Sequence, residues 1–98
     1  MNYDSKLGFW NEHPPGASLD YGFDWVRNLK QGETVSASTW TSSAGDLSRQ
    51  QIDGTKTSVF FSNGVEGDIY YLVNTVTTSE NRVFVLRITL LCKHLTKF

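Results

Sequence analysis

Two segments in the C-terminal third of the chain show the clearest alternation of hydrophobic and polar positions. Residues 69–77 and 83–92 are rich in β-branched and aromatic residues, and the polar residues 78–81 separate them, which predicts a β-hairpin. Successive strand side chains point to opposite sides, so each strand has one set of residues that shares a face: Tyr70, Leu72, Asn74 and Val76 on the first, and Phe84, Leu86, Ile88, Leu90 and Cys92 on the second. The second set is almost wholly apolar, and we expect it to lie in a core.

The first half of the chain predicts two further strands joined by one helical turn. Residues 19–25 alternate between apolar and polar types, the pattern of a half-buried strand. Apolar residues within 25–29 then fall at helical spacing, with Asp24 as a candidate N-cap and Gly32 as a candidate left-handed stop. Residues 33–41 are mostly small or β-branched, which again favours a strand.

Trp40 does not fit the alternation of its own predicted strand. Val35, Ala37 and Thr39 share one parity, and Trp40 falls on the other. Three explanations remain open: Trp40 caps a sheet edge, it follows a β-bulge, or it is exposed at an interface. On the third, Trp40 is a candidate partner-binding residue.

The middle of the chain gives a weak signal followed by a strong one. Residues 41–55 are rich in Ser, Gly, Asp and Gln, with only Leu47 and Ile52 to bury, so we expect a loop with at most one short strand. Residues 56–62 restore the alternation and predict a further strand.

The dipeptide Asn63-Gly64 admits two structures. Asn-Gly is a strong signal for a tight hairpin, but residues 63–68 could instead form a longer crossing between two sheets. Tyr70 follows Gly67 by three residues at the start of a long strand, as the tyrosine of a tyrosine corner does in immunoglobulin-like sandwiches. We favour the crossing. Together the elements predict an all-β antiparallel sandwich or small barrel.

Residues 1–18 show neither a strand nor a helix period, and Pro14 and Pro15 argue against both structures. We expect an irregular N-terminal arm. It is either a loose terminus or a segment that Phe9 and Trp10 anchor on this molecule or on a partner, because exposed aromatic side chains are costly unless covered. Phe9 and Trp10 are therefore candidate partner-binding residues.

The composition limits the domain count and the classes of partner. The 98 residues suit one domain, with residues 1–18 as the arm, 19–92 as the β-domain and 93–98 as a tail. The formal net charge of −1, with scattered basic residues, gives no support to nucleic-acid binding. No signal peptide or membrane-spanning stretch is recognisable, so we expect the chain to be cytoplasmic when made. The lone Cys92 is expected to be a buried thiol.

Candidate catalytic and metal-binding residues are few. Both histidines, His13 and His94, lie in the segments that we expect to be held least rigidly, and catalysis requires fixed geometry, so we expect no enzyme activity and no cofactor. The carboxylates are best explained as turn residues rather than as a calcium site: Asp20, Asp24, Asp53, Glu66 and Asp68. Four aromatic residues could offer a stacking surface to a glycan but are more often packing residues: Trp10, Trp25, Trp40 and Tyr71.

Three stretches of the sequence resemble a family of small tailed-phage and prophage proteins with an immunoglobulin-like sandwich. They are LDYGFDW at residues 19–25, GETVSASTW at 32–40, and NGVEGDIYYLVNTVTTSENR at 63–82, which LRITLLC follows. The chain departs from the family pattern at Glu33, where Asp is usual, and in its longer aromatic arm. The resemblance implies an antiparallel immunoglobulin-like β-sandwich and no catalytic motif.

The resemblance also implies a non-enzymatic virion protein, made in the host cytoplasm, that decorates or cements the head or lies at the neck or tail. Its expected partners are other virion proteins, either the major capsid protein or neck and tail proteins, in a homo-oligomer or in many copies. Neither nucleic acid nor membrane is expected as a partner. Two alternatives remain: a carbohydrate- or receptor-binding module of a fibre or cell surface, and an assembly chaperone or inhibitor that would be absent from purified particles.

Overall fold

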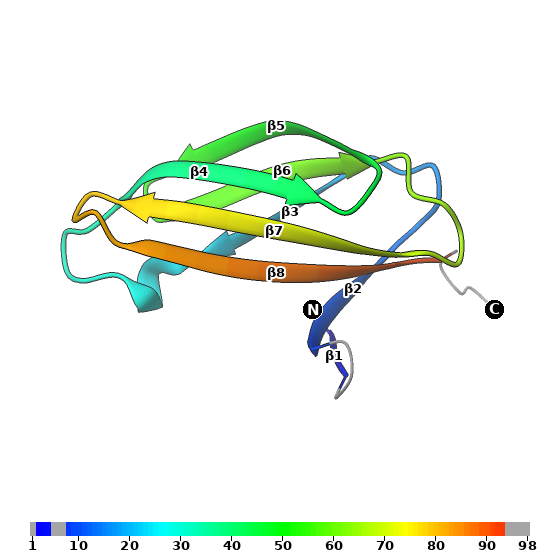
Figure 1. Cartoon of the computed structure of the whole chain (residues 1–98), viewed down its shortest axis with the longest axis horizontal. Helices are drawn as coiled ribbons and strands as arrows, with labels where there is room; N and C mark the ends of the chain where they lie inside the picture. The colour runs from blue at the N-terminus through cyan, green and yellow to red at the C-terminus, as the bar shows by residue number, and fades with distance from the viewer. Residues whose placement is uncertain (1, 5–7, 94–98) are drawn as a thin grey trace.

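The structure is a computed structural model that describes residues 2–4 and 8–93, with side chains described for residues 11–93. Within these residues the chain forms eight β-strands and one short 3-10 helix (Figure 1): β1 Asn2–Asp4, β2 Gly8–His13, β3 Leu19–Asp24, η1 Trp25–Asn28, β4 Val35–Ser42, β5 Asp46–Asp53, β6 Lys56–Ser62, β7 Ile69–Thr78 and β8 Val83–Cys92. No helix in this part of the chain is long and apolar enough to cross a membrane. The predicted all-β class is confirmed.

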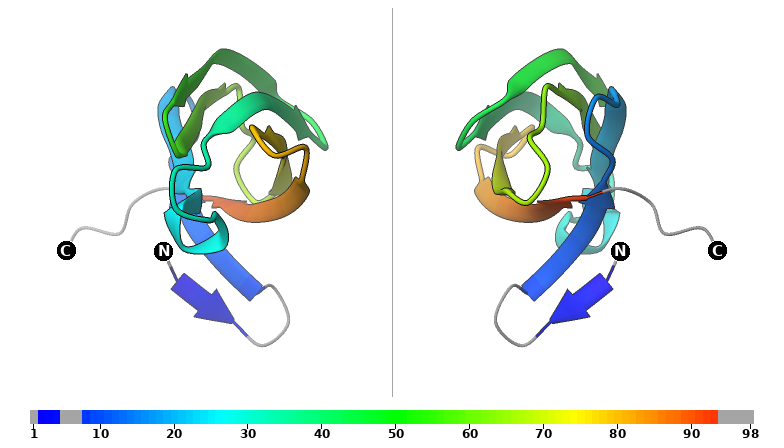
Figure 2. Two further views of the ribbon diagram at one scale, coloured as in Figure 1. Left: turned by 90° about the vertical axis from the view of Figure 1, so that its left-hand side faces the viewer. Right: turned by 90° about the vertical axis from the view of Figure 1, so that its right-hand side faces the viewer.

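The strands form two curved sheets that face each other, as the end-on views show (Figure 2). The five-stranded sheet has the order β1-β2-β8-β7-β4, and the three-stranded sheet has the order β3-β6-β5. Side chains from both sheets make up the main core: Trp40, Val59, Phe61, Tyr70, Leu72, Ile88, Leu90 and Cys92. The structure thus has two packed sheets, and its assignment to the immunoglobulin-like type remains a prediction.

The β7–β8 hairpin follows the sequence pattern closely. Its register pairs Leu72 with Ile88 and Tyr70 with Leu90, so the two expected core faces lie side by side. All four of these residues are buried, and so is Cys92. Burial also raises the pKa of the Cys92 thiol, which keeps it protonated and unreactive. The predicted hairpin and the buried cysteine are both confirmed.

Residues 63–68 cross from one sheet to the other, since β6 and β7 belong to different sheets. The Tyr70 hydroxyl accepts a hydrogen bond from the backbone N–H of Val65 at 2.8 Å. This tyrosine therefore ties the crossing to the start of β7, as the spacing suggested. The tight-hairpin alternative is excluded.

A β-bulge explains why Val35 and Trp40, which differ in parity, both face the core from β4. The register with β7 shifts between Val35 and Ala37, and the extra residue allows both Val35 and Trp40 to face the core. The first turn after β3 also follows the prediction, because the Asp24 carboxylate caps η1 by accepting from the Val26 N–H at 3.1 Å. The cap was predictable from the local sequence, whereas the bulge was one of three explanations that the sequence left open and became visible only in the register with β7.

The sequence predicted a loop with at most one short strand over residues 41–55, but Asp46–Asp53 form the full eight-residue strand β5. β5 is an edge strand, and nearly all of its side chains are exposed. A strand that buries little needs no apolar alternation, so the pattern carried no signal. A register shift between Ser48 and Gln51, with Arg49 at a φ of 52°, further disturbs the period.

The prediction of an irregular arm over residues 1–18 is also wrong in part, because β1 and β2 extend the five-stranded sheet. β2 pairs in parallel with β8, from Trp10 opposite Thr89 to His13 opposite Cys92. Pro14 and Pro15 follow the last residue of β2 and so remove no hydrogen-bond donor from the ladder.

Candidate partner-binding site

The β1–β2 hairpin, called the arm below, projects from the body of the molecule (Figures 1 and 2). Its base is fastened to β8 by the parallel ladder, and the backbone N–H of Lys93 donates to the carbonyl of His13 at 3.1 Å. Lys93 also forms an ion pair with Glu12 at 3.4 Å. The predicted partner-binding residues Phe9 and Trp10 have their backbone in β2, while their side chains lie outside the described part of the structure.

His13 anchors the base of the arm inside the domain. The side chain is fully buried, its Nε2–H donates to the Ala17 carbonyl at 3.1 Å, and its Nδ1 accepts from the Tyr21 hydroxyl at 2.6 Å. The ring also meets Phe61 edge-on, with 5.0 Å between centroids. Burial lowers the pKa of His13 and raises that of Tyr21 to about 12, so both are neutral near pH 7. The expectation that His13 lies in a loosely held segment is wrong.

The crossing between the sheets packs closely against this anchor. A Cβ atom placed on Gly64 would lie 2.9 Å from the Cys92 sulfur and 3.5 Å from the His13 ring, closer to the sulfur than van der Waals contact allows. Glycine is therefore needed here for close approach. The base of the arm, the crossing and the end of β8 form one tightly packed junction.

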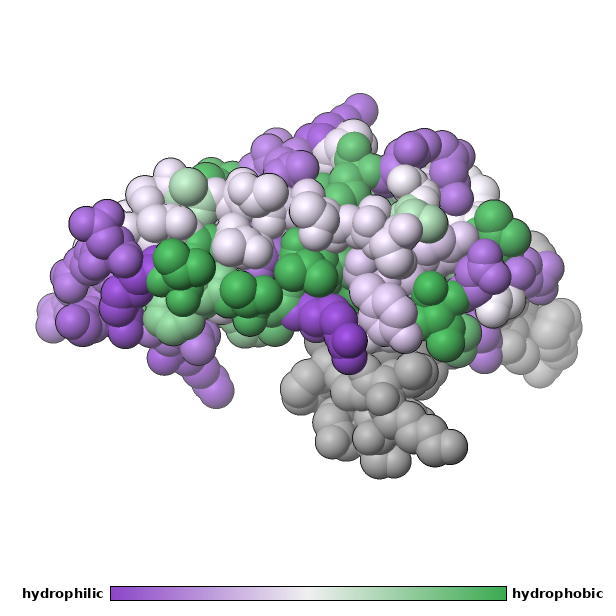
Figure 3. Space-filling model, viewed as in Figure 1, coloured by the Kyte–Doolittle hydropathy of each residue, from purple (hydrophilic) through white to green (hydrophobic). Residues whose placement is uncertain are grey.

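The outer face of the β7–β8 hairpin carries the most exposed apolar side chains of β8. Val83 is 61% exposed and Val85 is 64% exposed. On the neighbouring strand β7, Val73 is half-buried and pairs with Arg87 of β8. Several apolar residues, with polar ones between them, are visible on the surface in the space-filling view (Figure 3). Exposed apolar residues that gather on one face mark a candidate interaction surface.

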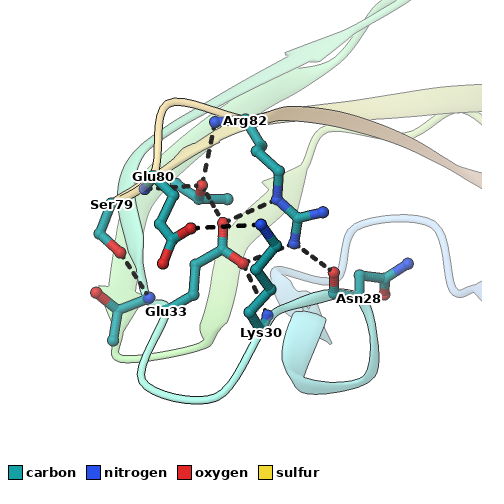
Figure 4. A network of polar contacts seen from close by, with 8 residues as sticks. Asn28, Lys30, Glu33, Ser79, Glu80 and Arg82 are labelled. Carbon is teal, nitrogen blue, oxygen red and sulfur yellow. Dashed lines mark hydrogen bonds and ion pairs between the residues drawn. The ribbon is translucent and has the colours of Figure 1, made fainter.

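An ion pair between the buried Glu33 and the partly exposed Arg82 lies at the end of the molecule that carries the β7–β8 turn (Figure 4). Both carboxylate oxygens of Glu33 accept from the Arg82 guanidinium, at 2.6 and 3.1 Å. Glu33 also accepts from the Lys30 backbone N–H at 2.8 Å and from the Thr78 hydroxyl. The hydrogen bonds from Arg82, followed by that from Thr78, lower the pKa of Glu33 to about 2. This network joins the loop before β4 to the β7–β8 turn, a structural role that the sequence did not reveal.

Trp40, the third predicted partner-binding residue, lies in the core and is only 3% exposed. The prediction that it contacts a partner is wrong, because a side chain sealed between two sheets offers no surface. Trp25 is equally buried and donates to the Thr57 hydroxyl at 3.1 Å. The Tyr71 ring is half-buried, with the Arg87 guanidinium 4.8 Å above its centroid. These three rings do not form an open stacking surface.

The structure gives little support to a metal or small-molecule site. No group of three or more potential ligands gathers among the residues that the structure describes. A shallow, open depression of about 390 Å³ lies where β3, β5 and β6 meet, and its lining includes Asp24, Asp53 and Lys56. The Asp24 carboxylate is already bonded to Val26 and Thr55. His94 lies outside the described residues.

Comparison with known proteins identifies one family. The family model described as "Podophage GP4 fiber-tail adaptor protein gp77" matches residues 14–91. No curated protein matches the chain. The matched span begins just after β2, so it covers the two-sheet body without the arm. Since the match covers most of the chain, this protein belongs to the podophage fiber-tail adaptor family and is a virion structural protein of tailed phages, as the resemblance in its sequence implied.

Proposed function

We propose that this chain joins a tail fibre to the tail of its phage and has no catalytic role. The family match over residues 14–91 carries the proposal. The buried His13 has both ring nitrogens in hydrogen bonds within the fold, which gives this side chain a structural role. Neck and tail proteins are therefore the partners that we propose, and no observation favours the capsid contacts of a decoration or cement protein.

An adaptor needs two surfaces, one for each neighbour. The arm is one candidate, since it projects from the body and lies outside the span shared with the family. The outer face of β7–β8, with Val83 and Val85, is a second. Several copies on one particle would add their contacts together, so that modest single contacts suffice for stable attachment. Assembly would take place in the host cytoplasm.

The carbohydrate-binding alternative receives less support. Glycan-binding sites commonly present exposed aromatic rings for stacking, and Trp25 and Trp40 are each only 3% exposed. The chaperone alternative differs in location, because such a protein would be missing from purified particles. We therefore propose the adaptor role alone.

Deleting residues 1–9 tests the role of the arm. The deletion removes β1 and the outer end of β2, but it keeps the paired residues from Trp10 to His13 and the His13 anchor. We expect an unchanged melting temperature and a strong loss of incorporation into particles, measured by mass spectrometry of virions produced by a phage that lacks its own copy of the gene. A deletion of residues 1–18 would be a poor test, because it also removes His13 from the core.

A truncated chain that enters particles as well as the full-length chain would show that the arm is dispensable for attachment. His94→Gln, a substitution outside the arm, serves as the control and should be incorporated normally.

A further inference from the structure

The burial of β8 changes abruptly where its neighbour β2 ends. Next to β2, the core-facing residues Ile88 and Leu90 are at most 1% exposed, and the outward-facing Thr89 is buried as well. Beyond β2, the core-facing Phe84 and Leu86 are only half-buried. Beside the first half of β8, the gap between the edges of the two sheets, called the seam below, is therefore incompletely covered. Beside the second half of β8, strand β2 covers it.

The backbone of this first half has one unpaired side among the described residues. The Thr78 N–H donates to the Arg82 carbonyl, and the Cys92 N–H donates to the Asp68 carbonyl. Hydrogen-bonded residues alternate along an antiparallel ladder. These two bonds therefore show that the backbone N–H and C=O groups of the even-numbered residues of β8 point toward β7. The backbone N–H and C=O groups of the odd-numbered residues point to the opposite side of β8, where β2 lies. The bond from the Lys93 N–H to the His13 carbonyl is an example.

The unpaired groups are thus the N–H and C=O of Val83, Val85 and Arg87. The register of β2 with β8 stops at Thr89, and no described strand takes its place beside these three residues. An open, apolar strand edge is a ready template for pairing with another chain. The edge continues the ladder that already holds β2, so it has the geometry to accept a strand.

We propose that the edge of β8 at residues 83–87 receives an extended segment of another virion protein, which adds a strand to the five-stranded sheet beside β2. The inference rests on the proposed adaptor function and names the surface through which one neighbour is held. Backbone hydrogen bonds supply the affinity in such strand addition, and alternate side chains supply the specificity. The inserted segment would also cover Phe84 and Leu86, as β2 covers Ile88 and Leu90.

The edge defines the chemistry of the inserted segment. Its side chains on the outer face would lie against Val83 and Val85 and should be apolar there. Near Arg87 an acidic side chain is favoured, because this arginine has a ring contact with Tyr71 but no acidic partner among the described residues. The core-facing side chains should be apolar, since they would close over the seam.

A proline substitution at Val85 tests the backbone contact. Val85→Pro removes an N–H that points away from β7, and proline is tolerated on an edge with that orientation, so the chain should fold. The control Val85→Thr keeps the N–H and the β-branched shape. Particles made without the native copy of the gene should contain the Val85→Thr chain near the wild-type level and less than a tenth of that amount of Val85→Pro. Equal incorporation of both variants, or equal loss of both, would overturn strand addition.

Amide hydrogen exchange tests the same edge without a substitution, and so does not depend on how Val85→Pro folds. In the free chain, the amides of Val83, Val85 and Arg87 should exchange much faster than those of Phe84 and Leu86. In purified particles the peptide covering residues 83–88 should become protected. Slow exchange at all five positions in the free chain, or unchanged exchange in particles, would contradict the proposal.

Two further outcomes separate this inference from others. Sedimentation of the free wild-type chain should show a monomer, and a dimer that Val85→Pro dissociates would mean that a second copy, rather than another virion protein, occupies the edge. Absence of the wild-type chain from particles would reject the adaptor function and this inference with it. Normal incorporation of a folded Val85→Pro would reject only the inference.

Discussion

His13 is a polar side chain that is fully buried. It is buried where β2, the Tyr21 ring and the sheet crossing meet, and two hydrogen bonds satisfy its ring nitrogens. Cys92 and Gly64 lie in the same junction, so close together that a side chain at position 64 would collide with the sulfur. The arm is thus held by a single well-packed point as well as by its ladder.

The buried imidazole makes the stability of the fold sensitive to mild acid. Burial lowers the pKa of His13 below its usual 6.5, so as pH falls below that value the unfolded chain takes up a proton that the folded chain does not. The free energy of unfolding should therefore decrease from about pH 7.5 to about pH 5.5, where carboxylates contribute little. Thermal melts should show this decrease in the wild type and in the control His94→Gln, and much less of it in His13→Gln. An identical decrease in all three would assign it to another group.

Ile88 tests the core assignment. It is 1% exposed and packs between the sheets, so Ile88→Ala should lower the free energy of unfolding by roughly 2 to 5 kcal/mol, as large-to-small core changes do. Val85→Ala on the same strand should change it little, since Val85 is exposed. Chemical denaturation of both variants measures the difference, and similar values for the two would contradict the placement of the core.

At the scale of elements, a strand was easier to predict from the sequence when more of its side chains are buried. β7 buries one full face and β8 buries or half-buries the residues of its core face, so their alternation and their turn were readable. β5 is exposed on both faces, and β2 joins the sheet through a parallel partner 79 positions away in sequence, as the pairing of Trp10 with Thr89 shows. Neither leaves a local pattern. The bulge in β4 was one of three explanations that the sequence allowed, and only the register could choose among them.

The Glu33 network should stabilise the end where the loop before β4 meets the β7–β8 turn. The hydrogen bonds from Arg82 and Thr78 hold the pKa of Glu33 at about 2, below its usual 4.5, so its stabilising effect is present above pH 4.5 and is lost as pH falls toward 2. Glu33→Gln should therefore melt at a lower temperature than the wild type near neutral pH, and the gap should narrow in acid.

The control for this change is Glu80→Gln, which breaks only the exposed ion pair with Lys30 at 3.6 Å. Exposed pairs contribute little, so this variant should melt close to the wild type at every pH. A gap between Glu33→Gln and the wild type that stays constant from neutral pH to about pH 3 would show that the loss is not electrostatic.

For the whole molecule, the family match identifies a virion structural protein, and the structure shows that it is built almost entirely of β-strands. Two of the three predicted partner-binding residues, Phe9 and Trp10, belong to the projecting arm, and the prediction of their role still stands. Trp40 was misplaced because a bulge cannot be located from parity alone. The exposed half of β8 was missed, since an unpaired strand edge depends on where its neighbours stop and leaves no mark in the sequence of the strand itself.

The location of the chain in the particle tests the adaptor function most directly. Purified virions labelled with a gold-conjugated antibody against this chain can be viewed by negative-stain electron microscopy, with fibreless particles as a comparison. We predict gold at the junction between fibres and tail, and labelling of the tail that persists when fibres are absent. Gold distributed over the capsid surface, or virions without the chain, would contradict the account.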